Sequence, residues 1–410
     1  MNRRRPVRGT LMISMVVLLV ASMTSFTQTA ALATSLEILR ESPPAENPLP
    51  ATDRNIPQPV TFDECTPSRP NPADGYFKNR FSTCQKTQLR YRQYACPEPG
   101  CQLVGEAVVY VVVTRNMVPS QRRVVISHRM QFSSIHGLPD TTRFGATMTC
   151  AAKDTSGTAD CDVPEAKVTK SIAEWKARPV EDTVFTMRGE DPPIYQDPPE
   201  IQAEKRTWYN LGRTLFVEGE NGQVENAPQL STEARCDEAG YVQGSKCVFP
   251  KPALFVVDLH DPAIRDYGRL VADAIHSPID KLYPGPAEGS HIPGWFGDIL
   301  ALRSYPLTRT HHQAAQDASK TRSEYYCARR WGPDWHTGPD GLVLKCAVYP
   351  FNSTRDGAGH YPGHGTGANP SFAVLPLPER TFSAMEQTVN DFIGRHHILD
   401  GDRYWIWLLE

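Results

Sequence analysis

The sequence predicts an α+β protein in which a disulfide-bonded, β-rich amino-terminal region precedes an α+β carboxy-terminal domain. Strand-like patterns of period two dominate residues 106–217, whereas helix-like periodicity appears only after residue 255. The ten cysteines also fall into five pairs of sequence neighbours. We therefore expect four segments, namely a signal peptide (1–33), a flexible spacer (34–60), a β-rich region (61–250) and a carboxy-terminal domain (251–410).

The first 33 residues have the order of a secretory signal peptide. Four arginines, at positions 3, 4, 5 and 8, precede an apolar run from Leu11 to Met23, and small residues end at Ala33. The apolar run has about 13 residues, fewer than the roughly 18 to 20 that cross a bilayer. We expect cleavage, secretion, and no transmembrane segment in the mature chain.

Charge and composition limit the classes of function that this chain can have. Removing the four leader arginines takes the formal charge from −3 to about −7, which is not typical of a general polyanion binder. Any contact with nucleic acid then needs a local cluster of Lys and Arg. Residues 34–59 are rich in Pro, Glu, Ser and Asn, which predicts the flexible spacer.

The cysteines predict local disulfides in an oxidising compartment. The expected pairs are Cys65–Cys84, Cys96–Cys101, Cys150–Cys161, Cys236–Cys247 and Cys327–Cys346. Zinc binding is the alternative, but the CxxC spacing of zinc knuckles is absent.

The β-rich region is predicted from alternating β-branched residues. Expected strands cover 106–114, 123–132, 143–150, 182–188 and 207–217. His128 lies on the apolar face of the second of these strands, and we expect a core histidine with its hydrogen bonds satisfied.

The carboxy-terminal third mixes helices and strands. Residues 255–259 predict a strand, Asp261-Pro262 a helix start, and 264–275 and 310–331 helices. A final strand, 403–409, is apolar on both faces and is expected in the core. Ten of the twelve histidines follow residue 255, which favours this domain as the working part.

The segment 345–359, Lys-Cys-Ala-Val-Tyr-Pro-Phe-Asn-Ser-Thr-Arg-Asp-Gly-Ala-Gly, resembles the signature of the NucA/NucB-type secreted deoxyribonuclease family. Asp273-Ala274-Ile275 upstream and Leu399-Asp400-Gly401-Asp402 downstream resemble further parts of that family, so the resemblance covers roughly residues 255–410. It implies a nuclease-like α+β domain, with Cys327 placed to pair with Cys346, that hydrolyses DNA phosphodiesters with Mg or Mn.

One difference lies where the family carries Asp-Glu, because this chain has Ala347-Val348. Neither side chain binds a cation or takes a proton, whereas carboxylates would do both. Asp356 matches the later acid of the motif, and His360 and His364 follow it at a spacing that could place two imidazoles on one ion. Asp356, His360 and His364 are therefore the candidate substitute catalytic and metal site; the alternative is a solvated glycine-rich loop.

Basic and aromatic residues flank the motif. Arg329, Arg330, Lys345, Tyr349 and Arg355 are the candidate nucleic-acid contacts. Two functions follow from the sequence: an extracellular metal-dependent deoxyribonuclease, or a catalytically degenerate relative that binds nucleic acid or a protein partner. A third alternative assigns the biological role to the β-rich region, through a protein or cell-envelope partner.

Overall fold

The structure is a computed structural model that describes residues 58–65, 75–97, 100–153, 157–189, 197–219, 222–225, 230–242, 246–276, 282–286, 291–297, 305–359 and 371–410. The predicted leader and nearly all of the spacer lie outside these residues. Everything described belongs to one compact unit, Pro43–Glu410. Its fold is mixed and sheet-rich, as the sequence predicts.

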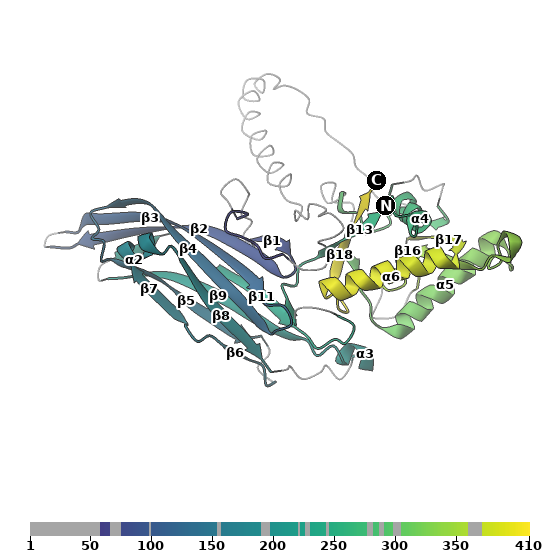
Figure 1. Cartoon of the computed structure of the whole chain (residues 1–410), viewed down its shortest axis with the longest axis horizontal. Helices are drawn as coiled ribbons and strands as arrows, with labels where there is room; N and C mark the ends of the chain where they lie inside the picture. The colour runs from purple at the N-terminus through teal and green to yellow at the C-terminus, as the bar shows by residue number, and fades with distance from the viewer. Residues whose placement is uncertain are drawn as a thin grey trace, which may run out of the picture. The chain divides into compact units, whose positions relative to one another are not determined.

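The first sheet of the β-rich half is antiparallel and has seven strands in the order β1-β2-β3-β4-β8-β6, with β10 also paired to β2 (Figure 1). The strands are β1 (Tyr76–Asn79), β2 (Ser82–Ala95), β3 (Gln102–Met117), β4 (Arg123–His136), β6 (Asp160–Asp162), β8 (Val180–Arg188) and β10 (Gly222–Glu225). Along β3 the odd-numbered residues from Ala107 to Val113 are buried, which is the period of two that predicted this strand.

The second sheet has five strands in the order β12-β11-β9-β5-β7. They are β5 (Arg143–Ala152), β7 (Lys167–Ser171), β9 (Thr207–Glu218), β11 (Leu230–Cys236) and β12 (Cys247–Val248). Its inner face shares one hydrophobic core with the first sheet, so the two sheets form a sandwich. Helix α2 (Ile172–Ala177) starts at a capping box formed by Ser171 and Glu174 and buries Trp175 in this core, and the short α3 (Pro199–Gln202) follows β8.

The carboxy-terminal half has a separate core built from helices and two small sheets. The first sheet has the order β13-β18-β15 and the second β14-β17-β16. The strands are β13 (Ala253–Asp258), β14 (Pro284–Gly285), β15 (Leu307–Thr308), β16 (Leu344–Tyr349), β17 (Phe372–Pro378) and β18 (Arg403–Leu409). The helices are α4 (Arg265–His276), α5 (Gln313–Trp331) and α6 (Glu379–His396), with a 3-10 turn at Pro339–Gly341.

All five predicted disulfides are present, and the described chain has no free cysteine. Within the described residues, no helix combines the length and apolar character needed to cross a membrane.

The expectation for β18 needs a correction. Tyr404, Ile406 and Leu408 are buried, but Trp407 on the other face is 39% exposed. Trp407 stacks on Trp295 with ring centroids 5.7 Å apart. Only one face of this strand is in the core. The other face is also apolar, because it carries aromatic side chains, but it is not fully covered.

Candidate functional site

The strand that carries the motif, β16, is buried. It pairs with β17 so that Ala347 lies opposite Leu375 and Val348 opposite Val374. Both Ala347 and Val348 are fully buried in hydrophobic clusters. The hydroxyl of Tyr267 donates to the carbonyl of Val348 (2.9 Å) and accepts from its amide (3.2 Å). The two positions where the family has acids are therefore packing positions in this chain.

Tyr349, an expected nucleic-acid contact, is also in the core. Its ring is fully buried, and its hydroxyl donates to the carbonyl of Pro293 at 2.8 Å. Burial raises the pKa of this phenol well above its ordinary value. The ring has no exposed face on which a base could stack.

Of the expected site formed by Asp356, His360 and His364, the structure describes Asp356. It is buried, and its Oδ2 accepts a 2.8 Å hydrogen bond from the amide of Thr308. Its Oδ1 is buried without a partner among the described residues. Burial raises the pKa of this carboxyl to about 6, although the bond from Thr308 opposes the shift.

The turn after Asp356 is closely packed against α5. A Cβ added at Gly359 would lie 2.3 Å from the amide nitrogen of Ser319, and one added at Gly357 would lie 2.7 Å from its hydroxyl. Ser319 in turn donates to the side-chain oxygen of Asn352 at 2.8 Å. The glycines of the motif therefore have a packing role, because α5 leaves no room for a side chain.

The rest of the substitute site, His360 and His364, lies outside the described residues. Within the described ranges, no group of three or more His, Cys, Asp or Glu side chains is arranged to hold a metal ion. With Ala and Val at 347 and 348, the described residues do not fit the divalent cation that the family resemblance implies.

Two expected contacts are engaged in ion pairs. Arg355 donates to Asp400 at 2.7 Å, and Asp400 also accepts from the amide of His311 at 2.9 Å. Lys345 is exposed and lies 3.3 Å from Glu379. Lys345 remains accessible, whereas Arg355 helps to fix the loop that contains Asp400.

Two of the expected contacts, Arg329 and Arg330, lie at the carboxyl end of α5, the helix labelled in Figure 1. Arg329 and Arg330 are exposed, Trp331 is 42% exposed, and Tyr325 is 58% exposed. The guanidinium of Arg330 lies 5.8 Å from the ring centre of Tyr283. We call Tyr283, Tyr325, Arg329, Arg330 and Trp331 the α5 patch. The sequence pointed to the arginines but not to the tyrosines, although Tyr325 occupies an exposed position of a predicted helix.

The disulfide Cys327–Cys346 fixes this patch relative to the motif strand. Cys327 lies one turn before Arg330 on α5, and Cys346 lies next to Lys345 on β16. The bond closes a loop of sequence separation 19. It holds the arginines of α5 and the lysine of β16 on one covalently linked framework.

The loop that resembles the family's closing motif is held by the β-rich half. Asp402 accepts from Arg80 at 2.9 Å and from Arg235 at 2.6 Å. Arg235 also donates to the carbonyl of His397 at 2.9 Å. Burial alone would raise the pKa of Asp402, but Arg235 and Arg80 more than offset it and hold the pKa below its ordinary value. Sequence reasoning missed these partners, because they lie more than 150 residues away.

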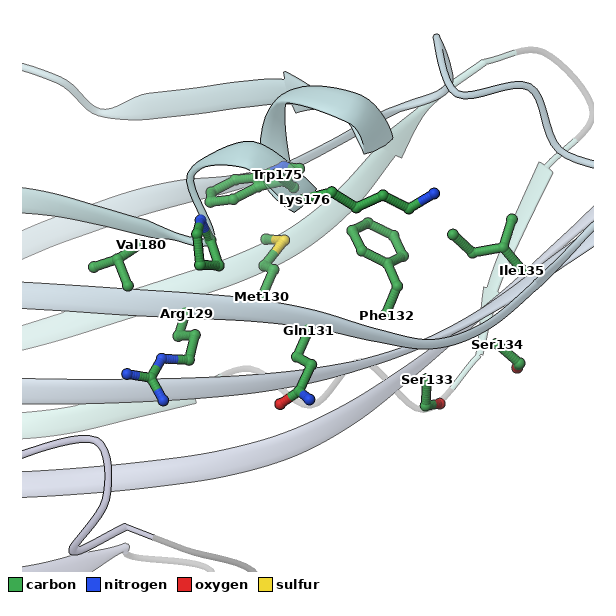
Figure 2. A pocket seen from close by; sticks show the side chains of 11 residues that line it. Arg129, Met130, Gln131, Phe132, Ser133, Ser134, Ile135, Trp175, Lys176 and Val180 are labelled. Carbon is green, nitrogen blue, oxygen red and sulfur yellow. The ribbon is translucent and has the colours of Figure 1, made fainter.

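A pocket of about 570 Å³ opens on the β-rich half, between β4 and α2. Figure 2 shows Met130 and Phe132 pointing toward Trp175, while Arg129 and Gln131 point to the opposite side of the strand. The pocket is therefore lined mainly by apolar groups, with Lys176 at its edge.

Comparisons with protein-family models, with curated proteins and with solved structures found no match to this chain.

Proposed function

We propose that this protein is an exported nucleic-acid-binding protein. Its carboxy-terminal domain has a nuclease-like fold, but it lacks the acidic pair with which the NucA/NucB-type family hydrolyses DNA. The burial of Ala347 and Val348 carries this proposal. Restoring acids there would place two unpaired carboxylates in an apolar interior, which is strongly unfavourable. The five disulfides fit the oxidising compartment to which the predicted leader directs the chain.

The α5 patch supplies the binding chemistry. Guanidinium groups contact phosphates, and exposed aromatic rings stack on unpaired bases. Arg329 and Arg330 stand beside the exposed rings of Tyr325 and Trp331, and α5 itself carries four basic and two acidic residues. A local basic patch is what an acidic chain needs to bind a polyanion.

The test is fluorescence anisotropy with single- and double-stranded DNA over a series of salt concentrations. We expect Arg329→Ala with Arg330→Ala to weaken binding and to lower the slope of log K against log salt by about 2. The control combines Arg123→Ala with Arg188→Ala, two exposed arginines of the β-rich half. Equal affinity of the two double variants for DNA would refute the role of the α5 patch.

One observation favours a second candidate, a weak nuclease centred on Asp356. Its Oδ1 has no partner among the described residues, and its raised pKa suits a proton-transferring group. The mature protein would be incubated with plasmid DNA and Mn or Mg, with and without chelator. Absence of nicking at high protein concentration would exclude this candidate. Nicking that Asp356→Asn abolishes would replace the non-catalytic proposal.

A further inference from the structure

The interior of the β-sandwich contains two arginines for which the described residues provide no acidic partner. Arg115 on β3 is 1% exposed and Arg213 on β9 is 2% exposed. Nε and Nη1 of Arg115 and all three guanidinium nitrogens of Arg213 are buried without a hydrogen-bond acceptor among the described residues. A guanidinium stays protonated in proteins, so two uncompensated positive charges lie between the sheets.

The strand registers bring further unpaired donors to the same place. Arg115 lies opposite Ile126 on β4, and Ile126 lies opposite Thr183 on β8, so all three share the inner face of the first sheet. The Thr183 hydroxyl is buried without a hydrogen-bond partner among the described residues. His128 is two residues beyond Ile126 on that face, and both of its ring nitrogens are also unpartnered. The expected burial of His128 is therefore confirmed, whereas the described residues supply no partner for its ring nitrogens.

The charges of Arg115 and Arg213 also affect the pKa values of groups in this core. Burial lowers the pKa of Arg213 to about 9, and repulsion from Arg115 adds to the shift. Burial lowers the pKa of Arg115 to about 10. Burial also holds the pKa of His128 well below its ordinary value, with contributions from Arg213 and Lys170. Arg213 alternates with Leu211 and Leu215, which belong to the core shared by the two sheets, so its side chain points from the second sheet toward the first.

No carboxylate compensates this cluster in the described part of the chain. The acid nearest in register is Glu181, which lies opposite His128 but forms an ion pair with Lys170. Neither Arg115 nor Arg213 has an ion pair within the described ranges. Breaking or omitting one partner of a buried pair is strongly destabilising, so a fold with two such charges needs a counter-ion.

We infer that the β-sandwich binds a small anion between its two sheets, with Arg115 and Arg213 as the charged ligands and Thr183 and His128 as further hydrogen-bond donors. The guanidinium fork matches the geometry of an oxyanion such as phosphate, sulfate or a carboxylate. Sheets packed face to face lie about 10 Å apart, and apolar side chains fill the surrounding core, which limits the ligand to a small one.

Trp175 marks the side from which the site is shielded. Its ring centre is 5.4 Å from that of His128, and the same ring lines the pocket in Figure 2. The indole N–H donates to the carbonyl of Phe144 at 2.9 Å, which fixes the ring over the histidine. The indole therefore covers this side of the site, and we expect a bound anion to exchange slowly enough to remain bound during purification.

Release of the anion is the first test. The full mature chain would be exchanged into a buffer whose only anion is HEPES, unfolded by heat in urea, and the released anions quantified by ion chromatography. We expect about one small anion per chain, and its chemical identity distinguishes phosphate, sulfate, chloride and acetate as sources. No released anion would overturn the inference, and this measurement needs no variant.

The second test compares Arg213→Met with the exposed-site control Arg188→Met. Thermal midpoints would be followed during titration with phosphate, sulfate or acetate at constant ionic strength. We expect a saturating rise for the wild-type chain and for Arg188→Met, and loss of that rise for Arg213→Met. The same rise in Arg213→Met would overturn the assignment, because a general salt effect is common to all three proteins.

Discussion

The β-rich half buries two pairs of arginines, and their surroundings differ. Arg80 and Arg235 both reach Asp402, and Arg235 also faces Asp237 at 3.8 Å. Arg115 and Arg213 lie on the inner faces of the two packed sheets, and neither has an acid partner among the described residues. The first pair has its counter-charge within the chain, supplied by a loop of the carboxy-terminal half. The second pair has no acid partner among the described residues, and we infer that a bound anion supplies its counter-charge. The same residue type therefore fixes an internal contact in one place and predicts a ligand in the other.

The largest change in the free energy of unfolding should come from the compensated pair, Arg80 and Arg235. Arg235→Met leaves Asp402 and Asp237 buried with fewer charged partners, and we expect a loss of about 3 to 5 kcal/mol in the free energy of unfolding. Urea unfolding monitored by tryptophan fluorescence measures it. A loss under 1 kcal/mol would mean that the ion pairs do not hold the Asp402 loop.

For the uncompensated pair, Arg115 and Arg213, we expect a change of opposite sign in the free energy of unfolding when the buffer contains no small anion. Arg213→Met removes a buried charge and keeps an apolar side chain of similar length, so the free energy of unfolding should be unchanged or rise by up to about 4 kcal/mol. The same urea experiment measures it on protein that has been unfolded, separated from the released anion and refolded in HEPES alone. A loss as large as that of Arg235→Met would show that Arg213 has an internal partner, and the contrast between the two pairs would disappear.

Asp356 is a buried acid that resembles the uncompensated arginines, because its Oδ1 has no partner among the described residues. Its folded pKa of about 6 exceeds the ordinary value of 3.8, so the folded state holds the proton more tightly than the unfolded state. The stability that this carboxyl contributes is full below about pH 4 and is lost as the pH rises through 6. Asp356→Asn should therefore raise the free energy of unfolding by about 1 to 3 kcal/mol at pH 7.5 and by much less at pH 4.5. The exposed Asp391→Asn is the matched control, and equal effects at both pH values would contradict this explanation.

The smallest effect should come from an exposed pair. Arg188 lies 2.9 Å from Asp162, with both side chains exposed. Arg188→Met should change the free energy of unfolding by less than about 1 kcal/mol, because water screens exposed pairs. This variant calibrates the urea measurements for the two buried arginines.

Local pattern predicted the elements that bury one face. The strands β3, β4, β5, β8 and β9 and the helices α4 and α5 all occur where the periodicity places them. It missed β2, whose sequence from Ser82 to Ala95 is polar on much of both faces. It also missed α6, residues Glu379–His396, which were considered only as part of the family resemblance.

Candidate sites were harder to predict than elements. The motif around Asp356 was found, but the burial of Tyr349 and the engagement of Arg355 with Asp400 depend on neighbours distant in sequence. The phase of β3 did contain a signal for Arg115, since it follows Val109, Val111 and Val113 at a spacing of two. A charged residue in an inward position is easily taken for the end of a strand.

The sequence by itself determined the strands β3, β4, β5, β8 and β9, the five disulfides between neighbouring cysteines and the absence of acids at positions 347 and 348. These features depend on local periodicity, short loop closure and residue identity. Only the tertiary structure decided which arginines are compensated, because Arg235 meets Asp402 across 167 residues, while Arg115 and Arg213 are buried in different sheets without an acid among the described residues. Charge compensation is a property of three-dimensional neighbours, and no local pattern in the chain encodes it.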